Sequence, residues 1–256
     1  MKIFDYYAHY YDLIYQDKDY ESEVEFIKDL LQTFSPTANS ILELGSGTGI
    51  HAVLLAEAGY TVRGVDNSAE MLDRAKSRQT RLEPEVAARL EFSYGDICAI
   101  DLEQKFDGAI ALFHVVDYQT TSTKLQDFFQ TARNHLNPDG ILIFDFWYGA
   151  AVLSDRPSIR VKRLENDEVS LMRIAEPIMY PQLNQVEVNY QVLITDKANG
   201  NVQELKESHQ MRYLFMPEIE LFLENVGMRI IKSGEWLSDR PAGIDTWGVY
   251  CVAKVL

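Results

Sequence analysis

The segment from Ile41 to Ile50, ILELGSGTGI, constrains the fold of this chain more than any other segment. A mostly apolar run precedes a turn with glycine at positions 45, 47 and 49, and apolar residues at helical spacing follow. Glycines allow a tight turn and a close approach of the backbone to a ligand. The helix behind them would direct free N–H groups and a partial positive charge at that ligand. The sequence therefore predicts a strand, a turn and a helix that hold a nucleotide-sized molecule.

The glycine spacing disfavours two common nucleotide-binding motifs. Gly45, Gly47 and Gly49 read G-x-G-x-G, whereas the dinucleotide motif G-x-G-x-x-G needs its third glycine at the position of Ile50. The G-K-[ST] sequence of a phosphate-binding loop is absent from this turn. Glu43 precedes the glycines, and a carboxylate there suits a cationic ligand better than a pyrophosphate. A NAD-dependent dehydrogenase remains an alternative that this spacing disfavours.

Length and composition indicate an ordinary globular protein. The chain has 256 residues, enough to bury a sizeable core, with 46% hydrophobic and 25% charged residues. No apolar run has membrane-spanning length, and the polar, tyrosine-rich start does not resemble a signal peptide. Cys98 and Cys251 lie far apart in apolar contexts, which indicates free thiols in a reducing compartment. We therefore expect a cytoplasmic protein.

Charge and residue spacing exclude several classes of partner. The formal net charge of −15 would repel a phosphate backbone, so nucleic acid is not an expected partner. No membrane association is expected either. No Cys/His pairs have the spacing of metal ligands, so no metal site is predicted. These observations favour a small-molecule ligand.

An acidic residue also ends the next predicted strand. The strand Thr61–Val65 runs into Asp66, about 20 positions past the glycine turn, where nucleotide-binding α/β folds place a carboxylate on ribose hydroxyls. Asn67 and Ser68 then open a helix. On this helix Met71 is a candidate to flank an adenine, with core packing as the alternative.

A third acidic residue follows the third predicted strand, near 90–94. Asp96 can accept a hydrogen bond from an adenine amine, and the N–H of Ile97 can donate to a ring nitrogen. The alternative is a turn aspartate that binds local backbone. Because Glu43, Asp66 and Asp96 follow three successive strands, we expect all three to hold the ligand.

The strand near 106–112 leads to the expected mouth of the site, because ligands of open α/β sheets bind outside the carboxyl ends of the strands. Phe113, at the end of this strand, is a candidate cofactor-binding residue. His114 is the candidate that accepts a proton or orients an amine, and a structural histidine is the alternative. Asp117 and Tyr118 follow in the same segment.

The N-terminal region carries many tyrosines. Residues 1 to about 35 are predicted to be helical, with a second helix that ends before Pro36. Tyr11 and Tyr15 are candidate cofactor-binding residues in a lid whose hydroxyls reach the ligand or the acceptor. The alternative is that these rings pack and leave their hydroxyls at the surface.

Strands and helices alternate as far as the strand near 141–146, which favours a parallel sheet. That strand follows a helix near 123–136 and an N-P-D-G turn, and it ends at Trp147 and Tyr148. Beyond position 158 the pattern alternates apolar and polar residues, which predicts an inserted antiparallel sheet. Its strands are expected near 159–165, 168–176, 184–195 and 202–215. A helix after Pro217 and strands near 228–236 and 246–255 complete the chain.

These patterns predict three regions. Residues 1–150 form N-terminal helices and a ligand-binding core, residues 151–215 form the antiparallel insertion, and residues 216–256 return to the core with a helix and a final pair of strands.

The motifs ELGSGTG, GVDNS, GDI and NPDG, within residues 41–147, resemble those of class I S-adenosylmethionine (SAM) methyltransferases. The resemblance implies an α/β fold with a Rossmann-like seven-stranded sheet and SAM as cofactor. It also implies that the candidate cofactor residues bind SAM, a molecule with a sulfonium, an ammonium, a carboxylate and a ribose. These residues are Tyr11, Tyr15, Glu43, Gly45, Gly47, Gly49, Asp66, Asn67, Met71, Asp96, Ile97 and Phe113.

A closer likeness is to bacterial nucleotide-sugar N-methyltransferases, which dimethylate TDP-amino-deoxysugars. It rests on the YDLIY and KDY segments before the fold, on Gly49-Ile50-His51, on the aromatic residues after the fifth strand and on the insertion. The resemblance implies an insertion that covers the acceptor and a homodimer. It also implies methylation of an amine. For that reaction His114 is our candidate base, and Tyr148 and Asp117 are our candidate orienting residues. The sequence FHVVDY at 113–118 departs from the small polar residues of those relatives.

Two alternatives stay open at this point. One is an O- or C-methyltransferase of another small metabolite, for which an acceptor hydroxyl would need a true base. The other is a protein that binds SAM without catalysis. The side chains expected at the strand ends, His114 and Trp147 among them, argue against the second alternative.

Overall fold

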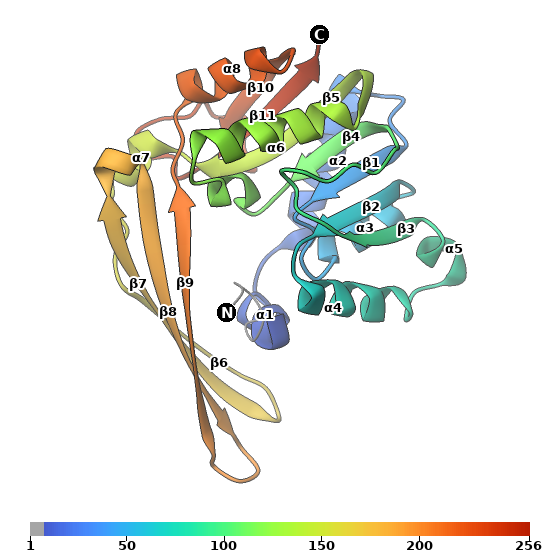
Figure 1. Cartoon of the computed structure of the whole chain (residues 1–256). Helices are drawn as coiled ribbons and strands as arrows, with labels where there is room; N and C mark the ends of the chain where they lie inside the picture. The colour runs from blue at the N-terminus through green and yellow to red at the C-terminus, as the bar shows by residue number, and fades with distance from the viewer. Residues whose placement is uncertain (1–7) are drawn as a thin grey trace.

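The computed structural model describes residues 8–256, so the first seven residues of the predicted helical N-terminus lie outside it. Two sheets organise the described chain (Figure 1). The larger sheet has seven strands in the order β10-β11-β5-β4-β1-β2-β3, and the smaller has four in the order β6-β7-β8-β9. The predicted seven-stranded α/β fold with an inserted antiparallel sheet is therefore confirmed.

The bounds of the elements are as follows. The seven-stranded sheet contains β1 (Ser40–Leu44), β2 (Thr61–Asp66), β3 (Leu90–Tyr94), β4 (Phe106–Ala111), β5 (Leu136–Trp147), β10 (Met228–Glu235) and β11 (Gly248–Val255). The four-stranded sheet contains β6 (Arg160–Glu165), β7 (Val169–Tyr180), β8 (Gln185–Asp196) and β9 (Val202–Arg212). The helices are α1 (Ala8–Ile14), α2 (Tyr20–Phe34), α3 (Ile50–Glu57), α4 (Ala69–Gln79), α5 (Pro84–Ala87), η1 (Val115–Tyr118), α6 (Ser122–Asn134), α7 (Gly149–Ser154), η2 (Pro181–Leu183) and α8 (Met216–Asn225).

The larger sheet is buried on both faces. Strands β1 to β5 pair in parallel, and β11 pairs antiparallel with β5 and β10. Apolar side chains of α6 and α8 pack against one face, and those of α2, α3 and α4 pack against the other. The near-continuous apolar runs of the central strands follow from this burial, because a parallel strand has no solvent-facing side. This arrangement brings the carboxyl ends of β1, β2, β3 and β4 to one edge of the sheet.

The smaller sheet extends away from the core, and its long strands β7 to β9 reach well beyond the seven-stranded sheet (Figure 1). Helix α1 lies between the two sheets, and Ile14 is buried there against Leu171 of β7 and Val192 of β8. Lys162 Nζ of β6 donates to the carbonyl oxygen of Ile14 over 2.7 Å. The N-terminal helix therefore bridges the inserted sheet and the core.

The N-P-D-G turn lies inside strand β5, whereas the sequence pattern predicted that it would separate a helix from a strand. We expected a helix to position 136 and a new strand from 141, but α6 ends at Asn134 and β5 runs from Leu136 through the turn. Leu136 already pairs with Phe106 of β4, and the register shifts before Gly108 pairs with Ile141. Backbone pairing thus continues across the turn, where Asp139 has a φ of 63°. The sequence pattern could not show this pairing, which depends on β4.

Three further expectations concern organisation. No helix among residues 8–256 is long and apolar enough to cross a membrane. A single chain does not test the homodimer, which stays a prediction. We retain the three-part division at residues 150 and 215 as a proposal, and we note that all four strands of the smaller sheet lie between Arg160 and Arg212.

Candidate active site

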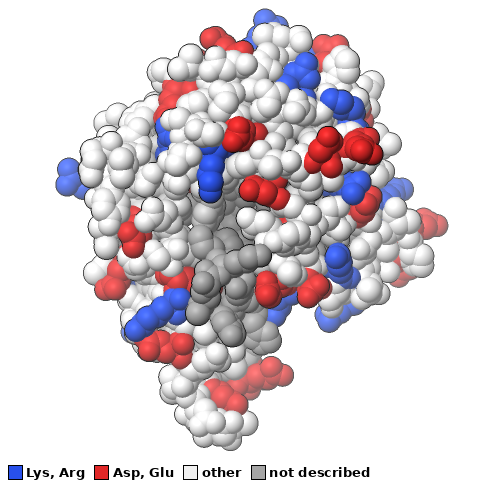
Figure 2. Space-filling model, in the orientation of Figure 1, with Lys and Arg blue, Asp and Glu red and all other residues white. Residues whose placement is uncertain are grey.

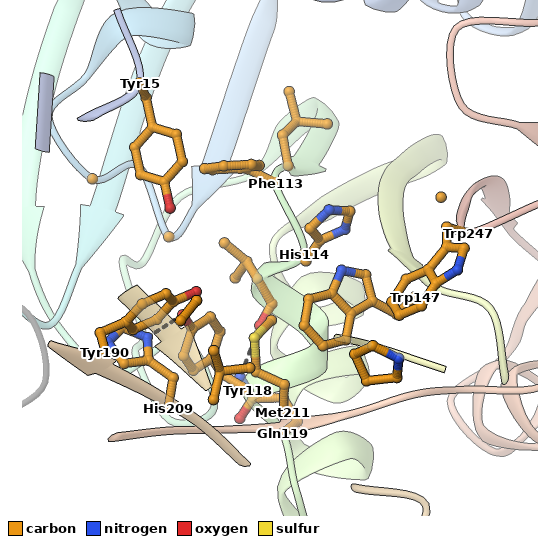
Figure 3. A pocket seen from close by; sticks show the side chains of 18 of the residues that line it. Tyr15, Phe113, His114, Tyr118, Gln119, Trp147, Tyr190, His209, Met211 and Trp247 are labelled. Carbon is orange, nitrogen blue, oxygen red and sulfur yellow. Dashed lines mark hydrogen bonds between the residues drawn. The ribbon is translucent and has the colours of Figure 1, made fainter. Parts of the chain in front are cut away.

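A cavity of about 940 Å³ opens at the carboxyl ends of the parallel strands and continues to the inserted sheet. Ten of the twelve candidate cofactor residues line it. They are Tyr11, Tyr15, Gly45, Gly47, Asp66, Asn67, Met71, Asp96, Ile97 and Phe113. Glu43 and Gly49 do not line it. His114 and Tyr118 line the cavity between the part near the glycine turn and the part below the inserted sheet, whereas Asp117 and Tyr148 do not line it (Figure 3).

The glycines of the turn serve two different purposes. Gly45 and Gly49 both have positive φ, and an added Cβ would lie 2.6 Å from Val115 Cγ2 at Gly45 and 2.8 Å from Phe92 Cζ at Gly49. These two positions let the loop pack closely against its neighbours. Gly47 has a φ of 52°, and an added Cβ there would meet nothing within 4 Å. Gly47 therefore leaves space open on the cavity side.

Asp66 is held beside this loop by backbone amides. Its Oδ2 accepts from Gly47 N and its Oδ1 accepts from Ser68 N, each over 2.8 Å. Burial raises the pKa of Asp66, although these amides oppose that shift. The remaining lone pairs of a carboxylate in this position can accept from two ribose hydroxyls. Further along the edge, Asp96 is exposed and accepts from Cys98 N over 2.9 Å, next to the buried Ile97.

Glu43 lies beneath the turn and not on the cavity wall, contrary to our expectation of direct contact. Only 2% of the residue is exposed, because it belongs to β1 in the middle of the sheet. Burial and the charge of Asp66 raise its pKa to about 8. His51 Nδ1 lies 3.7 Å from Glu43 Oε1. Within the described residues, Glu43 Oε2 has no hydrogen-bond partner. With this raised pKa, Glu43 is largely protonated at neutral pH, and it can act on a cationic ligand only through the loop.

Replacing Glu43 by glutamine is expected to remove a pH dependence of stability. The folded protein retains the Glu43 proton to about pH 8, whereas the unfolded chain releases it near the ordinary glutamate pKa of 4.5. Wild-type stability should therefore fall relative to that of Glu43→Gln as pH rises between these values, by at most about 1.4 kcal/mol per pH unit. Urea unfolding of both proteins from pH 4.5 to 9 measures this difference. A difference that does not change with pH would contradict the raised pKa.

The predicted tyrosine lid is ordered around Tyr15. Its ring lies 4.7 Å from that of Tyr11 and packs edge-on against Phe113 at 5.0 Å. The Tyr15 hydroxyl accepts from Arg173 of β7 over 3.1 Å. Asp12 ties the same helix to the core, because its carboxylate accepts from Thr48 Oγ1 and from the Arg78 guanidinium, each over 2.8 Å. The helix thus spans the cofactor half of the cavity.

His114 is held against a carboxylate that the sequence analysis did not identify. Phe113 and His114 have φ values of 64° and 63°, a conformation that costs energy for residues with side chains. Asp145 of β5 accepts from His114 N over 3.1 Å, and its Oδ2 lies 2.8 Å from Nδ1, at an angle short of a hydrogen bond. Apo active sites often show such contacts, which tighten on substrate binding. The contacts with the buried Asp145 carboxylate hold this strained segment and its imidazole at the cavity wall.

Asp117 and Tyr148 occupy positions that do not match the orienting role expected for them. Asp117 is fully buried, and its carboxylate accepts from Trp147 N over 2.9 Å. Burial, together with the charge of Asp145, raises its pKa. Tyr148 caps α7 and packs against Phe215 with ring centroids 6.5 Å apart. Both residues lie at the end of β5 and outside the cavity lining. This geometry therefore does not favour direct contact with an acceptor.

The acceptor half of the cavity contains residues that the sequence patterns did not identify. They come from the inserted sheet and from the connection between β10 and β11, and they include Arg173, Tyr190, His209, Met211, Trp236 and Trp247. Figure 3 shows Tyr190 and His209 toward one end of the cavity, and Trp147 and Trp247 toward the other. The two tryptophan rings pack edge-on with centroids 5.7 Å apart. The alternating pattern of the insertion predicted two faces but not which face lines a cavity.

Comparison with known proteins identifies the class. Residues 41–140 match the family model described as a methyltransferase domain. Over 92% of this chain and 94% of the relative, the chain is 25% identical to the dTDP-3-amino-3,4,6-trideoxy-alpha-D-glucopyranose N,N-dimethyltransferase of Streptomyces venezuelae. It is 24% identical, over 92% of this chain and 87% of the relative, to the dTDP-3-amino-3,6-dideoxy-alpha-D-glucopyranose N,N-dimethyltransferase of Streptomyces fradiae.

Solved structures show the same fold over the full length. DesVI of Streptomyces venezuelae superposes with a TM-score of 0.81 at 22% identity and covers 98% of both chains. An S-adenosylmethionine-dependent methyltransferase from Clostridium acetobutylicum superposes with a TM-score of 0.80 at 23% identity and covers 99% of both chains. The solved structures show the fold, and the matching domain together with the curated relatives identifies the chain as a SAM-dependent methyltransferase. Among known proteins, it is similar to sugar N-methyltransferases over nearly its whole length.

The residues present fit this cofactor. The open space at Gly47 admits a ligand close to the backbone, and Asp66 offers lone pairs for ribose hydroxyls. Glu43 supplies a buried carboxyl with an unpartnered oxygen beneath the loop, and a cation bound above it would favour the ionised form of this carboxyl. The individual roles of the cofactor residues remain our predictions.

Proposed function

We propose that this methyltransferase methylates the amino group of a nucleotide-linked deoxyaminosugar. The observation that carries the proposal is the continuous cavity, about 940 Å³, which runs from the glycine turn to the inserted sheet. This volume lies at the upper end of the range for small-molecule sites and leaves room for an acceptor beside the cofactor. The names of the relatives from Streptomyces venezuelae, Streptomyces fradiae and Saccharopolyspora spinosa support an amine on a dTDP-sugar as that acceptor.

The acceptor half has chemistry that suits such a molecule. The rings of Trp147 and Trp247 provide apolar faces for a sugar or a base. Arg160 and Arg173 also line the cavity. Guanidinium groups bind phosphate oxygens through paired hydrogen bonds, so these two arginines can receive a diphosphate within an otherwise acidic protein.

The chain itself must orient the amine and remove a proton. Bound SAM supplies a methyl group that its sulfonium already activates. The cavity walls then hold the amine in line and exclude water, which accounts for much of the rate enhancement in such reactions. His114, backed by Asp145 at 2.8 Å, is positioned to take a proton from the acceptor.

The test is a product assay by mass spectrometry. The protein is incubated with SAM and a panel of dTDP-sugars that carry the amine at carbon 3 or carbon 4, the positions in the names of the relatives. We expect a gain of one or two methyl masses on at least one sugar. The same sugars with a hydroxyl in place of the amine serve as matched controls and should gain none. Absence of product from every aminosugar, with SAM bound, would contradict the proposal.

Methylation of a hydroxyl is the second candidate, because a histidine beside a carboxylate, as His114 is beside Asp145, can act as a general base. A hydroxyl needs such a base far more than an amine does, since a free amine is already nucleophilic. His114→Asn should therefore lower kcat by about 100-fold or more with a hydroxyl acceptor, but by less than about tenfold with an amine. Rates for wild type and His114→Asn on the best acceptor, with cooperative thermal unfolding as the folding control, decide between the two.

A further inference from the structure

Hydrogen bonds connect three polar side chains into a chain that joins the core to the inserted sheet at the cavity wall, and Figure 3 shows two of the three, Tyr118 and His209. The Tyr118 hydroxyl, at the end of η1, lies 2.8 Å from Nδ1 of His209 on β9. The other ring nitrogen, Nε2, lies 3.1 Å from Oε2 of Glu207 on the same strand. Tyr118 and His209 line the cavity, and only 2% of His209 is exposed.

The two hydrogen bonds that join Tyr118, His209 and Glu207 have a defined donor and acceptor order. A carboxylate can only accept a hydrogen bond, so Glu207 requires the hydrogen of His209 to be on Nε2. In a neutral imidazole that hydrogen is the only one on the ring, so Nδ1 accepts and Tyr118 donates, whereas a charged ring would donate from Nδ1 to Tyr118. With its only hydrogen directed at His209, the Tyr118 oxygen can act toward the cavity only as an acceptor.

Packing holds the imidazole in this orientation. The ring of Tyr190, on the neighbouring strand β8, meets the ring of His209 edge-on at 4.9 Å. Burial raises the pKa of both Tyr118 and Tyr190, so both phenols keep their protons. Tyr118 is therefore unsuited to be the base of the reaction.

The position of Tyr118 links the two halves of the cavity. Helix η1 begins with Val115, whose side chain contacts Gly45 of the cofactor loop so closely that a Cβ at Gly45 would lie 2.6 Å from it. Three residues later Tyr118 contacts β9 of the inserted sheet. The short helix η1 therefore connects the glycine turn to the inserted sheet, and Tyr118 lines the cavity at the inserted-sheet end of this helix.

We propose that Tyr118 accepts a hydrogen bond from an N–H of the methyl-accepting amine, and that His209 and Glu207 are positioning residues that keep Tyr118 an acceptor. The inference rests on the proposed function, amine methylation, and deepens it. An amine that donates its N–H to Tyr118 has its lone pair directed elsewhere in the cavity, toward the methyl donor. The site therefore selects primary and secondary amines, because a tertiary amine has no N–H to donate.

The transfer itself balances without a further reactant. The nitrogen lone pair forms the new N–C bond, the methyl–sulfur bond breaks, and its electron pair stays on sulfur. The nitrogen then carries one proton too many, which it loses to His114 or to water. Tyr118, His209 and Glu207 gain and lose no proton in this step.

The first test reads the direction of the chain without any substrate. In wild type labelled with ¹⁵N-histidine, NMR should show His209 neutral, with its hydrogen on Nε2 and an unprotonated Nδ1. Tyr118→Phe should shift the Nδ1 resonance and leave the hydrogen on Nε2, and this shift also assigns the signal. A hydrogen on Nδ1 in wild type, in a neutral or charged ring, would overturn the proposal.

The second test measures rates on the aminosugar that wild type methylates best. His209→Phe keeps an aromatic ring against Tyr190 but removes the acceptor at Nδ1, whereas His209→Asn retains an acceptor oxygen. We expect Tyr118→Phe and His209→Phe each to lower kcat about tenfold, the equivalent of one lost hydrogen bond. The affinity for SAM should not change, and His209→Asn should recover most of the rate. Equal rates for His209→Phe and wild type would contradict the proposal.

The two tests separate this inference from the proposed function. If wild type methylates no aminosugar, the proposed function fails while the NMR result still decides the direction of the chain. If wild type is active but the His209 hydrogen is on Nδ1, only this inference fails. If His209→Phe does not melt cooperatively, the comparison uses Tyr118→Phe, which removes the same hydrogen bond without a change in β9.

Discussion

Gly47→Ala is expected to weaken SAM binding about 100-fold, or about 2.7 kcal/mol, while the protein still folds. Gly47 lines the cavity, and an added Cβ would meet no atom of the protein within 4 Å. The new methyl group would instead occupy the space beside the loop that the ligand needs for a close approach. Isothermal titration calorimetry with SAM measures the loss of affinity.

Gly200→Ala is the matched control for this change. Gly200 also has a positive φ, 74° against 52° at Gly47, and it too has open space around an added Cβ. It lies in the turn between β8 and β9, far from the cavity (Figure 1). Both variants should lose about 1 kcal/mol of stability from the backbone strain. Equal SAM affinities for the two variants would contradict the position that we assign to the cofactor.

Asp66→Asn is expected to weaken SAM binding by about 100-fold or more. Hydrogen bonds to a charged carboxylate are worth about 1.5–3 kcal/mol each, and two ribose hydroxyls can donate to Asp66. The asparagine would also turn an NH₂ group toward one of the two amides, Gly47 N or Ser68 N, that the carboxylate now binds. The variant should therefore lose hydrogen bonds both to the loop and to the ribose. Titration of the variant with SAM and with S-adenosylhomocysteine measures the effect.

Asp107→Asn separates the effect on the ligand from the effect on the fold. Asp107 Oδ2 accepts from two backbone amides, Asn39 N and Ser40 N, each over 3.0 Å, so it resembles Asp66 in its local bonds. It lies near the start of β4, at the opposite end of the sheet from the cavity. Asp107→Asn should lower stability and leave SAM affinity within about twofold of wild type. If both variants lost affinity equally, Asp66 would have only a structural role.

The sequence analysis predicted the core of this fold well, because its signals are local. Strand β3 has the predicted bounds, Leu90–Tyr94, and Ser68 caps α4, the helix after β2, as expected. The carboxyl ends of parallel strands meet at one edge, so a residue that follows a strand can be placed from the sequence alone. This is why Asp66, Asp96 and His114 line the cavity as we expected.

Other parts of the site depend on contacts between distant segments. Asp145 lies inside an apolar strand, and nothing local shows that it contacts His114, 31 positions earlier. The chain from Tyr118 to His209 spans 91 positions and depends on how the inserted sheet packs on the core. Glu43 was expected on the cavity because it precedes the glycines, but the burial of β1 places it below the loop. A sequence pattern gives the face of a strand without showing what covers that face.

A crystal structure with S-adenosylhomocysteine bound tests the central claim most directly. Our account predicts that the ribose hydroxyls lie on Asp66, that the adenine lies beside Asp96 and Ile97, and that the sulfur faces the cavity wall formed by Phe113 and His114. Electron density for the cofactor analogue at another place in the protein, or a glycine turn filled by side chains while the ligand is bound elsewhere, would contradict it.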